Sequence, residues 1–203
     1  MTKHPVEEFV LRKIIQLSAA LAASASMPAF AHPGLHHAAG FASGFAHPLA
    51  GWDHLLAMLA VGLWAAQQRR AMAIALPLAF PLVMLLGALA AIAGLGIPGA
   101  ETGIAASVLV LGLLVAFAVK LPAWGGLPVI ALFAAAHGYA HGLEAPARSG
   151  FALYGAGFLA ATVLLHLTGL AVGRAMQSGA SSPLVRALGT GMAAAGAYLL
   201  AAI

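Results

Sequence analysis

The chain has 203 residues, of which 63% are apolar and only 7% are charged, and its mean hydropathy is +1.00. Soluble domains are about 45–50% apolar and about 25% charged, so this composition excludes a soluble globular domain, a disordered chain and a coiled coil. The net charge of +4 is the difference between nine Lys and Arg residues and five Asp and Glu residues. No more than two basic residues are adjacent, which leaves no basic face for nucleic acid. The chain has no Cys, which excludes disulfides, thiolate metal sites and thiol catalysis.

The segment 1–31 has the pattern of a secretory signal peptide. Lys3, Arg12 and Lys13 make a basic start, a short apolar run follows, and the small residues of Ala-Phe-Ala at 29–31 suit a cleavage site. We predict cleavage at the end of this segment, and the alternative is an uncleaved signal anchor. Cleavage would place His32 on the outer side of the membrane.

Six apolar stretches follow, and we predict that they are transmembrane helices, because lipid requires backbone groups that are bonded within the segment. They cover residues 48–66, 71–95, 102–119, 127–143, 151–173 and 184–203. The predicted fold class is all-α: a polytopic membrane protein with a six-helix transmembrane bundle after removal of the signal peptide. Residues 32–46 would be a His-containing periplasmic tail, in which residues 36–46 fit a re-entrant half-helix, an extension of the first span or a loose tail.

Small residues and prolines predict two further features of these helices. The spacing G-x-x-x-G at 40–44 and at 169–173 favours close approach of helix backbones. Pro77 and Pro81 lie inside the second stretch and should kink it, because proline removes a backbone hydrogen bond.

The positive charges predict the direction in which the chain crosses. If the mature chain starts outside, the loops after the first, third and fifth spans are cytoplasmic. These loops hold Arg69, Arg70, Lys120, Arg174 and Arg186. The outer loops hold only Arg148, which agrees with the positive-inside rule. We therefore predict a bacterial inner-membrane protein with both mature termini in the periplasm.

A first cluster of ionisable residues opens the first span, and such residues in a membrane are functional candidates by default. His47-Pro48 begins the cluster and Asp53-His54 ends it. Pro48 fits the first turn of a helix, and on one straight helix His47 and His54 would share a face, about 20° apart. Asp53 would point about 100° away from His54, toward a neighbouring helix or a histidine on it.

A second cluster ends the fourth span. His137 and His141 are four residues apart and Glu144 follows three later, so all three line one face if the helix continues that far. Gly138 and Gly142 thin this helix and allow another backbone or an ion to come close. Because the fourth span runs outward, its end should meet the start of the first span at a similar depth.

The two clusters together predict a metal site. Imidazole and carboxylate without thiolate suit Ni(II), Co(II), Zn(II) or Cu(II) rather than Ca(II) or Mg(II). Carboxylates would also offset the charge of a divalent ion at membrane depth. The predicted ligands are His47, Asp53, His54, His137, His141 and Glu144.

Five weaker candidates each have an ordinary structural explanation. Glu101 lies at a predicted helix N-terminus, where the helix dipole favours an anion. His166 lies deep in the fifth span, as an exit-path ligand or as the donor of a hydrogen bond between helices. His32, His36 and His37 either collect ions in front of the first span or are solvated.

The pattern H-P-x-x-G-x-D-H at 47–54 resembles the signature of the HupE/UreJ family, membrane proteins associated with hydrogenase and urease. The second motif of that family, H-G-x-E, is similar to residues 141–144, and the resemblance covers the whole chain. It implies a nickel permease, with cobalt transported by some members, and functional positions at His47, Asp53, His54, His141 and Glu144. The more distant nickel/cobalt permeases have H-x4-D-H, whereas five residues separate His and Asp here, so we do not assign the chain to that group.

We therefore predict an inner-membrane permease, in residues 47–203, that imports a divalent transition metal, Ni(II) first and Co(II) second, and that has no permanent cofactor. The chain lacks the motif G-x-x-x-x-G-K-[ST], which indicates a secondary transporter and not an enzyme. The expected partners are the ion and the lipid bilayer. The resemblance links the protein only indirectly to hydrogenase or urease maturation, and a homo-oligomer is compatible with it.

Two other functions would use the same histidines. A redox protein would hold a haem between His54 and His141, and its absorption spectrum would show a Soret band. A membrane accessory protein would hold a metal or a maturation complex without transport, and replacing either histidine would leave metal accumulation unchanged.

Overall fold

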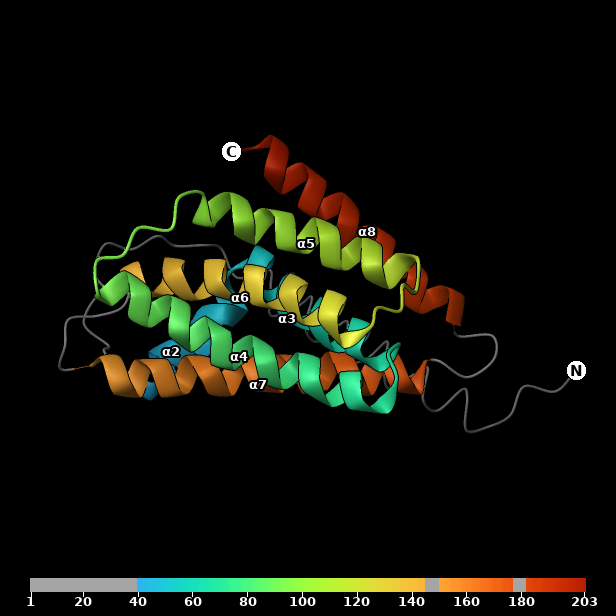
Figure 1. The fold of residues 1–203 in the computed structure, drawn as a ribbon, viewed down its shortest axis with the longest axis horizontal. Coiled ribbons are helices and arrows are strands. Elements are labelled where there is room, and N and C mark those ends of the chain that lie inside the picture. The colour runs from blue at the N-terminus through green and yellow to red at the C-terminus, as the bar shows by residue number, and fades with distance from the viewer. Residues whose placement is uncertain (1–39, 145–149, 177–181) are drawn as a thin grey trace, which may run out of the picture. The chain divides into compact units, whose positions relative to one another are not determined.

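The computed structural model describes residues 40–144, 150–176 and 182–203, and in these ranges the regular structure is entirely helical (Figure 1). Predictions for the signal peptide, for His32, His36 and His37 and for Arg148 lie outside these residues. The described helices are α2 (Phe41–Ala50), α3 (Trp52–Ala66), α4 (Arg70–Ile92), α5 (Ala100–Ala116), α6 (Ala123–Glu144), α7 (Phe151–Ala175) and α8 (Ser182–Ala201).

Several of these helices are suited to a membrane. The helices α4, α6, α7 and α8 are long and apolar enough to cross it, and α2 with α3 adds a fifth crossing if the pair counts as one broken span. Helix α5 is apolar but has only 17 residues. The six predicted stretches coincide with α3 to α8, with ends that differ by at most four residues. The all-α class is therefore confirmed for the described residues, and four or five crossings are supported by the length and composition of their helices, whereas a count of six crossings stays a prediction.

The prediction for the start of the first span is wrong. Residues 41–66 form two helices that are bent by 86° at Gly51, whose backbone is extended. Pro48 lies inside α2 and not in the first turn of a span. Proline removes one helical hydrogen bond and glycine disfavours helix, so the first helix stops between them. Residues 41–46 are therefore part of a broken or re-entrant helix, and neither a loose tail nor a straight extension.

Glycines make the closest contacts between helices. Gly44 of α2 lies against the backbone of Tyr154 in α7, and Gly169 of α7 lies against the backbone of Leu59 in α3. The close packing predicted from the small residues is therefore confirmed at Gly44 and Gly169, whereas no atom lies within 4 Å of a Cβ added at Gly40. Helix α2 runs against the first half of α7, α4 lies along α6, and α8 packs mainly on α5 at the edge of the bundle (Figure 1).

Because successive helices alternate in direction, the acidic residues and the histidine cluster lie at one end of the bundle and the basic residues at the other. One end of the bundle, which we call the histidine end, contains the starts of α3, α5 and α7 and the end of α6. The opposite end, which we call the basic end, holds Arg69, Arg70, Lys120, Arg174 and Arg186. The five basic residues from which the membrane orientation was predicted therefore lie at the same end of the bundle.

The contact between α5 and α8 can be tested with one methyl group. A Cβ atom at Gly112 would lie 2.9 Å from the carbonyl oxygen of Gly189 and even closer to the backbone of Ala193. We expect Gly112→Ala to lower the free energy of unfolding by about 1–3 kcal/mol, because the backbones must move apart. The measurement is thermal unfolding in detergent. Gly191→Ala is the control, since no atom lies within 4 Å of its added Cβ; equal melting temperatures for the two variants would contradict this packing.

Candidate metal centre

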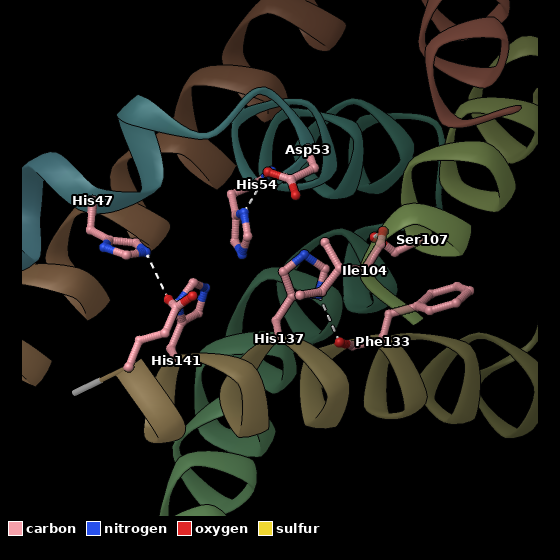
Figure 2. Close-up of polar contacts among 9 residues, drawn as sticks. His47, Asp53, His54, Ile104, Ser107, Phe133, His137 and His141 are labelled. Carbon is pink, nitrogen blue, oxygen red and sulfur yellow. Dashed lines mark hydrogen bonds and ion pairs between the residues drawn. The ribbon is translucent and has the colours of Figure 1, made fainter. Parts of the chain in front are cut away.

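Four histidines from three helices meet at the histidine end (Figure 2). The ring centroids of His54 and His141 are 4.4 Å apart, those of His47 and His141 are 4.9 Å apart, and those of His54 and His137 are 5.1 Å apart. The His54 ring lies between the two imidazoles of α6. The structure thus brings together two segments that are more than 80 residues apart in the sequence.

The sequence spacing predicted that His47 and His54 share a face of one helix, and this prediction is wrong. They lie on two helices and face each other across the bend, with ring centroids 6.3 Å apart. Residues seven apart share a face only on a straight helix, and the helix is broken at Gly51 between these two.

Asp53 also differs from its prediction, because its carboxylate pairs with its own neighbour, His54, and not with a histidine on another helix. Its Oδ1 accepts a hydrogen bond from the backbone N–H of His54 at 2.7 Å and lies 2.6 Å from Nδ1 of the same residue. The backbone N–H groups in the first turn of a helix have no helical partner, so a nearby carboxylate folds back onto them. Nδ1 of His54 must then carry the proton, and Nε2 keeps its lone pair free toward the cluster.

Gly51 makes this pair possible. A Cβ atom at this position would lie 2.8 Å from Oδ1 of Asp53 and 3.1 Å from Nδ1 of His54. The chain bends at this residue, and its missing side chain leaves room for the carboxylate–imidazole pair. From the sequence, Gly51 was recognised only as part of a motif, although its position between Pro48 and Asp53 was an available signal for a break.

Glu144 connects the two segments. Helix α6 does continue to this residue, the condition under which it was expected to share a face with His137 and His141. Oε2 of Glu144 lies 3.4 Å from Nε2 of His47 and 3.4 Å from Nδ1 of His141. Donor atoms of these three residues lie within 4.8 Å of one another. This trio is the group of the described residues whose geometry most directly suits a metal ion.

His137 lies deeper than this trio and is fully buried. Its Nδ1 donates a hydrogen bond to the carbonyl of Phe133 at 2.8 Å, so its Nε2 also has a free lone pair. Within the described part of the chain, Nε2 of His54, of His137 and of His141 is buried without a hydrogen-bond partner. An unpartnered buried polar atom costs about 1–3 kcal/mol, so three of them together indicate a site that a ligand completes.

A polar cavity of about 300 Å³ opens beside these rings. It is lined by His47, Ala50, Gly51, Asp53, His54, Glu101, Ile104, Ala140, His141 and Glu144. Every acidic residue in the described ranges is among them, and no Lys or Arg is. Glu101 is in the first turn of α5, as predicted for an ordinary helix terminus, and it also faces this cavity.

His166 lies outside the cavity. Its Nδ1 donates a hydrogen bond to the carbonyl of Pro77 at 3.2 Å, so the structure contains the contact between helices that was one of its two predicted roles.

The sequence comparisons agree with the motifs from which the resemblance was drawn. A family model described as HupE / UreJ protein matches residues 19–199. The chain belongs to the HupE/UreJ family. The chain is similar to protein HupE of Rhizobium leguminosarum bv. viciae, with 44% identity over 172 residues, which are 85% of this chain and 90% of that protein. HupE/UreJ proteins are membrane accessory or transport proteins and not enzymes. No solved structure matches the chain.

The geometry of this HupE/UreJ site predicts the effect of a single methyl group at its bend. We expect Gly51→Ala to separate Asp53 from His54, so that the His54 ring loses its fixed Nδ1–H form. Nitrogen NMR of histidine-labelled protein reports this form directly. Gly40→Ala is the matched control, because nothing lies within 4 Å of its added Cβ; an unchanged His54 spectrum in Gly51→Ala would refute the assigned contact.

Proposed function

We propose that this protein is an inner-membrane permease that imports a divalent transition metal ion, Ni(II) or Co(II), through the cavity at the histidine end. One observation carries the proposal: all acidic residues of the described ranges line the same cavity, beside imidazole nitrogens that are buried without partners. Neutral imidazole and carboxylate together suit these ions. The imported metal would serve hydrogenase or urease maturation, as the family resemblance implies.

The residues have different roles in this proposal. His47, His141 and Glu144 would first bind the ion, because their donor atoms are already close together. His54 would bind next through Nε2, and Asp53 would hold its ring in place and add negative charge. His137 would receive the ion at the inner edge of the cluster, since its ring lies beside that of His54.

The proposed direction of transport follows from the charges. The basic end would face the cytoplasm by the positive-inside rule, and the histidine end would then face the periplasm. Helix α3 has 15 residues and covers about 22 Å, less than the hydrocarbon thickness of about 30 Å, so the cavity at its start would lie below the membrane surface. A membrane potential favours inward movement of a divalent ion by about 4.6 kcal/mol per 100 mV.

The haem alternative fits this arrangement poorly. Axial histidines bind opposite faces of a porphyrin, whereas the rings of His54 and His141 are in contact, with centroids 4.4 Å apart. No porphyrin fits between rings at this separation. If the protein is instead an accessory protein that holds a metal without moving it, the same site is expected but no transport.

Uptake of radiolabelled nickel and cobalt into cells decides between transport and holding. We expect His54→Ala and His141→Ala to abolish uptake, and Asp53→Asn to lower it by about 10–100-fold, because the amide keeps the size of the carboxylate but not its charge. Leu143→Ala is the control, since this exposed side chain lies next to Glu144 on the same helix. Wild-type accumulation in the histidine variants, at equal amounts of membrane protein, would show that the protein does not transport through this site.

The pH dependence of uptake tests the imidazole ligands. A histidine binds metal only when neutral, so protons compete with the ion for the imidazole nitrogens. Burial disfavours a protonated imidazole, so we expect the initial rate of nickel uptake to fall at acid outside pH, at values below the pKa of about 6.5 of a free imidazole. Rates are compared between pH 7.5 and pH 4 at constant free nickel and constant membrane potential; a flat profile over this whole range would argue against histidine ligands.

A further inference from the structure

His166 has a free ring nitrogen in the interior of the bundle. The residue is fully buried in α7, and its Nδ1 donates to the carbonyl of Pro77 in α4. That carbonyl lacks its helical partner, because the residue four positions later is Pro81, which has no N–H. Nε2 therefore keeps its lone pair, and no described residue forms a hydrogen bond with it.

His166 lies closer to the basic end than the cavity does. Its backbone carbonyl packs against Gly62 of α3, which is about 12 Å further along that helix than His54. Side chains of a helix tilt toward its N-terminus, and α7 starts at the histidine end. The imidazole therefore points back toward the cavity from a deeper level.

Phe80 separates this imidazole from the cluster. The ring centroid of Phe80 is 5.4 Å from that of His137 and 5.2 Å from that of His166, and its side chain is fully buried. One phenyl ring thus contacts the innermost histidine of the cluster and the deeper histidine. Thr162 lies one turn from His166 on the same face of α7, and its buried Oγ1 also has no partner among the described residues.

We propose that Nε2 of His166, together with the hydroxyl of Thr162, is a second and deeper binding position for the transported cation. The ion passes to it from His137 when the Phe80 ring turns aside. Conduction requires binding that is favourable enough to admit an ion but weak or multi-site enough to release it, so a second position deeper in the bundle favours release inward. The Phe80 ring contacts both His137 and His166 and lies on the path between them. This inference rests on the proposed function and adds an inner step to it.

The decisive variant is His166→Asn. The amide nitrogen of Asn takes the place of Nδ1 and still donates to Pro77, but Asn has no counterpart of Nε2, so the packing of α7 is kept and the ligand is lost. Two quantities are measured with Ni²⁺: equilibrium binding to the purified full-length protein in detergent, and the initial rate of uptake into proteoliposomes. Leu165→Val is the control, because Leu165 is buried next to His166 and has no polar atom.

We expect His166→Asn to keep the tight Ni²⁺ binding of the outer cluster, to lose any weaker binding beyond it, and to transport Ni²⁺ about tenfold more slowly or worse, with little change in the half-saturating concentration. Transport at the wild-type rate, or loss of the tight binding together with transport, would overturn the inference. If His166→Asn does not accumulate, Thr162→Val decides in the same way, because it removes only the hydroxyl at nearly constant volume. If uptake requires His54 but neither His166 nor Thr162, this inner step alone is refuted. If the wild-type protein shows no uptake at all, the proposed function itself is refuted.

Discussion

The contact between Asp53 and His54 lies in the first turn of α3, directly after the chain bends at Gly51. The 86° bend directs α2 away from α3, so that His47 approaches His141 from the side while His54 approaches it along α3. The absent side chain at Gly51 leaves the space that the carboxylate occupies. A straight helix would place both histidines on one surface, so that a single helix besides α6 would contribute imidazoles. Three helices can contribute imidazoles to one cavity because of this break.

Much of the fold followed from the sequence by simple physical arguments. Lipid forces long apolar stretches to be helical, so the positions of α3 to α8 were predictable to within a few residues. The two ionisable clusters were expected at one depth, because the directions of successive helices alternate. The structure brings them together, with Glu144 between His47 and His141.

The errors have different physical causes. Helical periodicity gives the direction of a side chain only while the helix continues, so the break at Gly51 invalidated the predicted relation of His47 to His54. The direction of Asp53 failed for a different reason: the angle around the helix axis does not report the rotamer, and unpaired N–H groups in a first turn attract a short carboxylate. The role of Pro81 could not be read from the sequence either. It leaves the carbonyl of Pro77 without a helical partner, and this carbonyl accepts a hydrogen bond from His166, which is more than 80 residues away.

The lining of the cavity has a consequence for the chemical form of its ligand. Asp53, Glu101 and Glu144 face the same space, and no Lys or Arg faces it with them. Such a surface repels negatively charged metal complexes, for example those with citrate or phosphate. A metal ion would have to leave such a complex before it enters, and the hydrated cation alone would be accepted.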